Sequence, residues 1–336
     1  MSLEYEAFLL ANSMHRSNIL SDIKLLWKSI AIDRADFLAI YLQKPSLKRA
    51  YLSYYWVLYA IKIARLLNNL KINFENPPKI LDLGAGPLSA TMGAALFYKN
   101  LSNIFAVDRD VNFMKIGLKS VEKLLNVKLD IEFIKANLKW FSSSWKPKLK
   151  IDLIFIAHVL NEFGNNYSSL EKKKKLILNA INCLSPNGVL LIIEPASKTI
   201  SRDLMKIRDW IQDNEQAKII APCFSGILKC PLLVQSKFNW CHSEISYNRP
   251  TDMAKIDKLL GLEKDFLKFS YLAITPIDSN RKSSKLRIVS GAMNSRYSSK
   301  YYVCSQDGIK TLSGYRNDIS NSFVDFRRGQ EIDLSV

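Results

Sequence analysis

Short apolar runs alternate with longer amphipathic stretches between residues 79 and 193, and this alternation constrains the fold more than any other feature. The apolar runs have the composition of strands and cover 79–83, 103–107, 131–135, 151–156 and 188–193. Apolar residues at helical spacing separate them over 88–99, 111–125 and 168–184. Crossover helices between parallel strands produce this order. We therefore predict an α/β fold with a doubly wound, mostly parallel, Rossmann-like sheet.

The predicted sheet occupies residues 77–200, and two regions of different character flank it. Residues 1–76 carry apolar side chains at helical spacing until Pro77-Pro78 breaks the pattern, which predicts an N-terminal helical region of three or four helices. Its aromatic run, Tyr51 to Tyr59, either packs in the core or stacks on bases, and the spacing favours the core. In residues 201–336 cysteines and prolines cluster first, and mixed strands that complete the domain follow.

Basic residues dominate the charge of the chain. Lysine and arginine number 48 against 31 aspartates and glutamates, and the net charge of +17 favours a polyanionic partner, nucleic acid first. The joint abundance of Lys, Ile and Asn is also what coding sequence of low GC content produces, so charge alone does not establish the partner. The 48% of hydrophobic residues suffices for a substantial core, which excludes a wholly disordered protein.

The N-terminus and the most apolar stretch argue against export and against membrane insertion. Met1 to Glu6 is acidic, whereas a secretory or transit peptide begins with basic residues. Tyr51 to Leu67 is interrupted by Lys62 and Arg65, so we expect no membrane-spanning helix. In a chain without an export signal, the five cysteines are expected to be thiols or metal ligands.

A glycine turn follows the first predicted strand. The segment from Asp82 to Gly86 ends an apolar run and precedes a helix, and small residues there let the backbone approach a ligand beside free helix amides. Leu88 stands where the dinucleotide fingerprint has its third glycine, which weakens an NAD interpretation. Asp108 ends the second strand, 22 residues beyond Gly86, where a carboxylate can accept hydrogen bonds from ribose hydroxyls.

This strand, turn and acid together resemble the class I S-adenosylmethionine-dependent methyltransferases. The resemblance implies a cofactor over the carboxyl ends of the strands, with the glycine turn at its methionine half, the acid at its ribose and the segment 136–138 at its adenine. The cofactor-binding residues that it implies are Asp82, Gly84, Ala85, Gly86, Asp108 and Asn137. A turn that serves only the fold is the alternative.

The end of the fourth predicted strand carries the candidate catalytic residues His158, Asn161 and Glu162. A methyltransferase places groups here that hold the methyl-accepting atom in line with the sulfonium. His158 can take a proton from that atom while Asn161 or Glu162 orients it, or His158 is merely hydrogen-bonded in the wall of the cleft. The tetrad NPPY of many amine methyltransferases is absent, so the acceptor atom is not assigned.

The cysteine pattern is the most specific signal in the chain. Cys223, Cys230 and Cys241 lie within nineteen residues among proline and glycine, and Cys304 follows after 62 intervening residues. Such a loop suits a metal centre, and four thiolates satisfy either tetrahedral zinc or an iron–sulfur cubane. We therefore expect a C-terminal cysteine-rich metal-binding segment, with four unrelated buried thiols as the alternative. Cys183 lies on an amphipathic helix and is expected in the core.

Several segments together resemble the methyltransferase-like proteins of the mitochondrial small ribosomal subunit and their bacterial relatives, over roughly residues 45–330. The segments are Val159 to Glu162, Ile193-Glu194-Pro195, Arg208, Ala221-Pro222-Cys223, Cys230-Pro231, Trp240-Cys241-His242, Arg249 and Phe269 to Leu272. The resemblance implies a class I methyltransferase with a four-iron four-sulfur (4Fe-4S) cluster on the four cysteines, acting on small-subunit ribosomal RNA during assembly. The chain differs from the family's usual residues at Leu88, Ala196-Ser197 and Phe224-Ser225.

Three hypotheses follow for the function. The leading one is S-adenosylmethionine-dependent methyl transfer to RNA of the small ribosomal subunit, with small-subunit proteins as further partners and the cytoplasm favoured over the mitochondrial matrix. The second is a non-catalytic, RNA-binding assembly factor on a methyltransferase fold, because fold does not establish activity. The third is a small-molecule methyltransferase, which predicts no salt-dependent binding of RNA.

Overall fold

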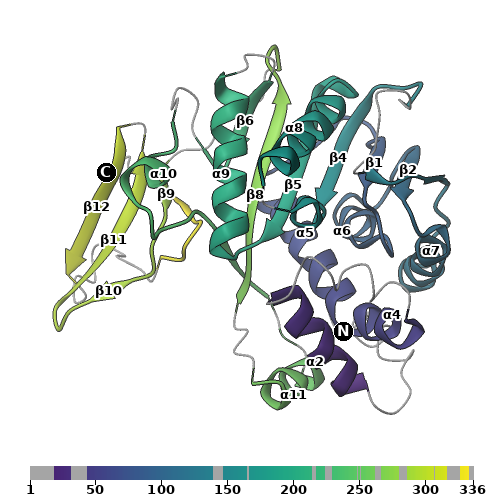
Figure 1. Cartoon of the computed structure of the whole chain (residues 1–336), viewed down its shortest axis with the longest axis horizontal. Coiled ribbons are helices and arrows are strands. Elements are labelled where there is room, and N and C mark those ends of the chain that lie inside the picture. The colour runs from purple at the N-terminus through teal and green to yellow at the C-terminus, as the bar shows by residue number, and fades with distance from the viewer. Residues whose placement is uncertain are drawn as a thin grey trace. The chain divides into compact units, whose positions relative to one another are not determined.

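The computed structural model describes residues 19–31, 44–138, 147–164, 166–213, 217–223, 229–247, 249, 251–261, 266–279, 286–305, 307–315 and 326–332 (Figure 1). The chain divides into two compact units. Unit 1 comprises Met1–Leu176 and Ile245–Leu267, and unit 2 comprises Ile177–Glu244 and Lys268–Val336. Within the described ranges, no helix combines the length and the apolar character needed to cross a membrane.

Four parallel strands form the sheet of unit 1, in the order β3-β2-β1-β4. They are β1 (Ile80–Leu83), β2 (Ile104–Asp108), β3 (Ile131–Lys135) and β4 (Ile151–Ala157). Ile80 pairs with Ile104 on one side and with Leu153 on the other, and all four residues of β1 are buried. The intervening helices are α6 (Ser89–Tyr98) and α7 (Val111–Leu125), and η3 (Leu160–Phe163) and α8 (Tyr167–Ile181) follow β4. The predicted parallel strands 79–83, 103–107, 131–135 and 151–156 and the helices predicted to follow them are thereby confirmed.

The N-terminal helices pack their aromatic side chains inside unit 1. They are α2 (Ile19–Ala31), α4 (Pro45–Tyr51), the π-helical turn η1 (Leu52–Trp56) and α5 (Val57–Asn69). Tyr54 and Trp56 are fully buried, and the Trp56 indole donates a hydrogen bond of 2.8 Å to the carbonyl of Pro87. A Cβ atom on Gly93 of α6 would lie 2.7 Å from Ile63, so this glycine lets α5 and α6 approach closely. The predicted core role of this aromatic run is confirmed for the residues of η1.

The segment Ile245–Leu267 belongs to unit 1 although unit 2 surrounds it in the sequence. It contains α11 (Thr251–Leu259), whose buried Asp257 accepts a short hydrogen bond from the Tyr54 hydroxyl and lies 3.3 Å from the guanidinium of Arg249. Met253 and Leu267 join the same apolar cluster as the N-terminal helices. Each unit is therefore built from two stretches of chain, whereas the ranges 1–76, 77–200 and 201–336 proposed from the sequence are continuous.

Unit 2 contains antiparallel strands, the α9 helix and a second sheet. β5 (Leu184–Pro195) and β6 (Ala217–Ala221) both pair antiparallel with β8 (Phe266–Pro276), and β7 (Ser243–Ser246) also pairs with β8. The helices are α9 (Lys198–Asp213) and the short α10 (Pro231–Gln235). The second sheet runs β10-β11-β9-β13, with β12 paired to β11. Its strands are β9 (Leu286–Ile288), β10 (Met293–Asn294), β11 (Ser298–Ser305), β12 (Gly308–Tyr315) and β13 (Glu331–Ile332), and β11 and β12 form a long ribbon (Figure 1).

Candidate functional site

A cavity of about 180 Å³ lies in unit 1, where β1, β2 and β4 end. Carboxyl ends of parallel strands are where ligands bind in open α/β sheets. Eight of the residues predicted from the sequence line it: Asp82, Gly84, Ala85, Gly86, Asp108, Asn137, His158 and Glu162. Asn161, the ninth, lies on η3 beside Glu162 but is not part of the lining.

The two glycines of the turn after β1 have different roles. Gly84 has a φ of 79°, and a Cβ atom there would lie 2.3 Å from a methyl group of Val159, so the fold itself requires glycine. Gly86 has a φ of 50°, and a Cβ atom there would meet nothing within 4 Å. The turn therefore leaves open space beside Gly86, on the cavity side, where a ligand can approach the backbone.

Leu88 adopts a left-handed conformation, with a φ of 63°, at the position where the resembling family has glycine. This conformation is strained for leucine, at a cost of about 1–2 kcal/mol. Its side chain is fully buried and packs with Ala85, Ala106 and Met114. Burial of the leucine side chain therefore offsets the backbone strain, and the turn keeps its shape without the third glycine.

The two acids near the turn are held by different hydrogen bonds. Asp108 accepts from the Gly86 amide at 3.0 Å through one oxygen and from the Asp110 amide at 2.9 Å through the other, so its carboxylate is fixed at the cavity. Asp82 is buried, accepts from the amide and the hydroxyl of Thr91, and so joins β1 to α6. Burial raises the pKa of Asp82 to about 6, against the opposing effect of the Thr91 hydrogen bonds.

His158 lies at the end of β4 in a left-handed conformation, with a φ of 61°, and its ring stacks on Tyr59 at 3.9 Å between centroids. The ammonium of Lys62, a buried residue of α5, lies 3.3 Å from His158 Nε2 and 4.5 Å from the centre of the Tyr59 ring. A lysine ammonium can only donate, so we infer that Nε2 accepts and that the ring proton of neutral His158 lies on Nδ1.

Lys62 is a site residue that the sequence pattern does not reveal, because its charge only interrupts an apolar stretch. A lysine on the buried face of α5, among Leu58, Ile61 and Leu66, was the available signal, since lysine is seldom buried without a partner. Its position beside His158 could not be deduced, because 96 residues separate the two.

Glu162, like His158 and Asn161, is partly exposed. Its carboxylate lies 3.8 Å from the guanidinium of Arg109, and both side chains are partly open to solvent. An exposed pair of this kind contributes little to stability, at most about 1 kcal/mol. Arg109 also lines the cavity, directly after Asp108. The ion pair can therefore open toward a bound molecule at small energetic cost.

The four cysteines predicted as metal ligands line a second cavity, of about 40 Å³, within unit 2. Cys223 follows β6, Cys230 precedes α10, Cys241 precedes β7 and Cys304 lies on β11. The structure thus brings together sulfurs from four separate segments. Cys183 is elsewhere, buried at the end of α8, with its thiol 3.2 Å from the Asn179 carbonyl, as expected for a core residue.

No preformed metal group is found among the residues that the structure describes: none of their His, Cys, Asp and Glu side chains gather in threes or more so as to hold an ion. The cysteine cavity nevertheless has the donors that a thiolate-bound group needs, and the buried guanidiniums of Arg208 and Arg287 line it as well. Burial raises the pKa of Cys223 and raises that of Cys304 to about 12, while the two arginines act in the opposite direction.

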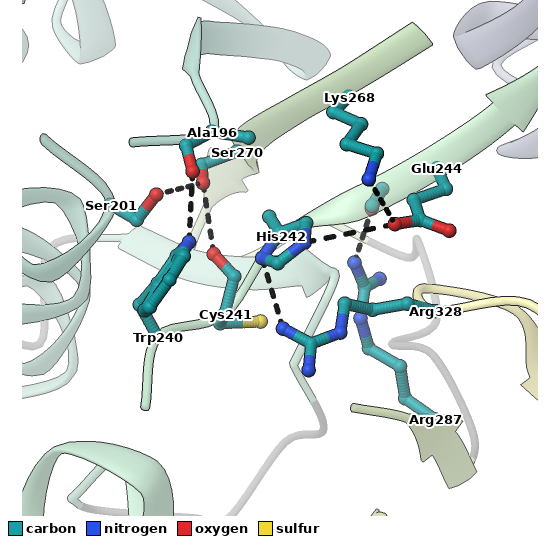
Figure 2. A network of polar contacts seen from close by, with 11 residues as sticks. Ala196, Ser201, Trp240, Cys241, His242, Glu244, Lys268, Ser270, Arg287 and Arg328 are labelled. Atoms are coloured by element: carbon teal, nitrogen blue, oxygen red, sulfur yellow. Dashed lines mark hydrogen bonds and ion pairs between the residues drawn. The ribbon is translucent and has the colours of Figure 1, made fainter. Parts of the chain in front are cut away.

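Polar contacts fix the loop that carries Cys241 (Figure 2). The Trp240 indole donates to the Ala196 carbonyl at 2.8 Å, and the Ser270 hydroxyl donates to the Cys241 carbonyl at 2.8 Å. Arg328 contacts His242 Nδ1 at 3.2 Å. Burial, followed by the positive charge of Arg328, lowers the pKa of His242 to about 3, so this imidazole is neutral and accepts from the arginine. Trp240 and His242 therefore hold the backbone on either side of Cys241 in place.

The sequence model of one protein family, described as the mitochondrial small ribosomal subunit protein Rsm22, matches residues 49–312 of the chain. The match spans the cavity of unit 1 and all four cysteines of unit 2. The chain belongs to the Rsm22 family. The Trp240-Cys241-His242 and Phe269 to Leu272 segments, on which the resemblance to this ribosomal group was based, lie within the matched range. Comparison with curated proteins yields no match.

Solved structures resemble this member of the Rsm22 family only distantly. A candidate RNA methyltransferase from Pyrococcus horikoshii is 11% identical over 66% of this chain and 85% of its own, with a TM-score of 0.38. NSun6 from Pyrococcus horikoshii, solved with SFG, is 16% identical over 66% and 52%, with a TM-score of 0.38. A candidate O-methyltransferase from Nostoc punctiforme is 18% identical over 57% and 53%, with a TM-score of 0.37.

Proposed function

We propose that this Rsm22-family protein is a class I S-adenosylmethionine-dependent methyltransferase that acts on small-subunit ribosomal RNA during ribosome assembly. The observation that carries the proposal is the cavity of unit 1. The glycine turn, Asp108, Asn137 and His158 meet there at the carboxyl ends of parallel strands. The family name supplies the ribosomal context.

The proposed cofactor site uses the two sides of the turn. The open space beside Gly86 accommodates the methionine half, and the fixed carboxylate of Asp108 accepts from the ribose hydroxyls. Asn137 lines the part of the cavity beyond β3 and offers an amide to the adenine. Asp82 accepts two hydrogen bonds from Thr91, so we assign it a structural role that stabilises the turn.

The proposed chemistry is direct transfer of a methyl group to a nucleophilic atom of the RNA. The sulfonium of the cofactor supplies an activated methyl group, so the protein contributes mainly by positioning the acceptor. His158 lines the cavity, but its Nε2 faces Lys62 and its Nδ1 is buried, so we assign its ring to the cavity wall against which the acceptor base is positioned. Glu162, at the cavity edge, is the better placed group to take a proton from the acceptor.

The same proposal includes a 4Fe-4S cluster on Cys223, Cys230, Cys241 and Cys304, with zinc as the alternative. Its support is the shared cavity of the four sulfurs and the two buried guanidiniums that favour negative charge on them. Bound there, the metal group would crosslink segments that are far apart in sequence, which is how structural metal sites stabilise small folds.

The experiment that tests catalysis is transfer of a labelled methyl group from S-adenosylmethionine to small-subunit RNA and to immature small subunits. Gly86→Ala serves as the cofactor-site variant, and Lys300→Met, an exposed residue of β11, serves as the control. Transfer by the wild type and the control but not by Gly86→Ala supports the proposal. RNA binding without transfer favours the non-catalytic assembly factor, which the +17 net charge equally suits.

Salt dependence separates both RNA hypotheses from the small-molecule methyltransferase. Binding to RNA through lysines and arginines releases counterions, so log affinity should fall with log salt by about 0.7–0.9 per neutralised phosphate. Filter binding at several salt concentrations measures the slope. A flat response would count against nucleic acid and for a small-molecule substrate.

A further inference from the structure

Arg287, on β9, is a buried guanidinium without a carboxylate partner among the described residues. Only 1% of its surface is exposed. It donates to the Tyr271 hydroxyl at 3.1 Å and makes a short hydrogen bond to the Ser243 hydroxyl, and both of these partners are neutral. Its Nε has no hydrogen-bond partner in the described part of the chain. Buried charges in proteins are normally paired, so a nearby anion would offset the cost of burying this arginine.

Arg208, the other buried arginine of the cavity, has a carboxylate partner. Arg208 is buried to the same degree and lines the same cavity, but it forms an ion pair of 2.8 Å with Asp209. The same Oδ1 atom of Asp209 also accepts from the Cys230 amide at 2.8 Å, so this carboxylate is held between Arg208 and the start of α10. Within the described part of the chain, a carboxylate thus neutralises the guanidinium of Arg208 but not that of Arg287.

The remaining charged groups around the cavity do not supply the missing anion. Glu244 pairs with Lys268 at 3.3 Å, next to His242. Glu331 lies opposite Arg287 in the β9–β13 register but is exposed, so solvent screens its charge. Arg328, which contacts His242 next to Cys241, adds a further positive charge. Among the residues that the structure describes around the four sulfurs, positive charge therefore exceeds negative charge.

We propose that Arg287 is a positioning residue that balances the net negative charge of a thiolate-bound metal group in the cysteine cavity. The inference rests on the proposed metal site and adds to it the residue that compensates its charge. Four thiolates outweigh the charge of either a zinc ion or an oxidised 4Fe-4S core, so both complexes are anionic. A buried cation beside an iron–sulfur cluster also favours its reduced, more negative form, because cluster potentials follow the local charge.

The test uses anaerobically purified protein with its native metal content, and it compares three substitutions with the wild type. Arg287→Met removes the charge, Arg287→Lys keeps the charge, and Ser243→Ala removes only a hydrogen-bond partner. Arg296→Met, an exposed arginine between β10 and β11, is the matched control. The readouts are metal and sulfide per chain, the rate of metal loss to a chelator, and the reduction potential of the cluster if iron is present.

Arg287→Met should lose metal at least tenfold faster than the wild type and shift the potential to a more negative value. Arg287→Lys, Ser243→Ala and Arg296→Met should stay within about threefold of the wild-type rate. Equal rates for Arg287→Met and wild type, or equally fast loss from Arg287→Lys, would overturn the inference and leave the metal site standing. Wild-type protein without metal would remove the metal site itself. If Arg287→Met does not fold, the retention of metal by Arg287→Lys decides the question.

Discussion

Replacing Gly84 by alanine should destabilise the protein far more than replacing Gly86, although both glycines belong to one turn and both have positive φ. The left-handed backbone costs about 1–2 kcal/mol at either position. At Gly84 the new Cβ atom would also lie 2.3 Å from Val159, a β-branched residue that is itself 7% exposed and cannot move away. Overpacking adds about 1–3 kcal/mol, so the total cost at Gly84 is about 2–5 kcal/mol.

Gly86→Ala has the complementary effect. Its Cβ atom meets nothing within 4 Å, so only the backbone cost of about 1–2 kcal/mol remains. The same atom occupies the open space assigned to the cofactor, and we expect its affinity for S-adenosylmethionine to fall at least tenfold, about 1.4 kcal/mol.

Urea unfolding followed by circular dichroism gives the free energy of unfolding of each variant, and titration calorimetry gives the cofactor affinity. The reasoning about the turn is refuted if Gly84→Ala and Gly86→Ala unfold at the same urea concentration. Wild-type cofactor affinity in Gly86→Ala would show that the cofactor does not lie on the open side of the turn.

Three further predictions follow from the sites. Asp108→Ala should weaken S-adenosylmethionine binding by about 1.5–3 kcal/mol, because the ribose loses a charged acceptor, and equal affinity by calorimetry would remove Asp108 from the site. The pKa of Asp82 is raised to about 6 in the folded protein, so its protonated form favours folding. The free energy of unfolding should therefore fall by about 2 kcal/mol as pH rises from about 4 to 6, and Asp82→Asn should flatten this part of the pH profile in urea titrations. Cys304→Ser should lower the metal content of anaerobic protein, whereas Cys183→Ser should leave it unchanged; elemental analysis that shows the reverse would contradict the ligand assignment.

Local patterns in the sequence predicted the strands and the turn because both depend on neighbouring residues. A buried parallel strand is an apolar run in the sequence, and a turn that a ligand approaches requires small residues. The segment from Ile80 to Gly86 could therefore be identified without a structure. The four cysteines also line one cavity, as expected for a shared site, while their role as metal ligands stays a prediction.

Contacts between distant segments were not predictable in this way. The pairing of Lys62 with His158 joins α5 to the end of β4, and nothing in either local sequence specifies the other. The same holds for Arg287, whose burial depends on β9 being covered by Tyr271 and Ser243. Leu88 shows a different limit: its conformation is left-handed even though the residue type disfavours it, because tertiary packing overrides the local preference.

The return of Ile245–Leu267 to unit 1 has a consequence for how the chain is made. Synthesis proceeds from the N-terminus, and domains usually fold as their residues emerge from the ribosome. The apolar cluster around Tyr54 and Trp56 needs Met253 and Leu267 to be complete, and the buried Tyr54 hydroxyl needs Asp257. The nascent N-terminal helices therefore cannot complete their packing until a segment about 200 residues later has been translated. By then a large part of unit 2 has already emerged. A ribosome stalled before α11 should accordingly carry a protease-sensitive N-terminal region, and one stalled well beyond Leu267 a resistant one.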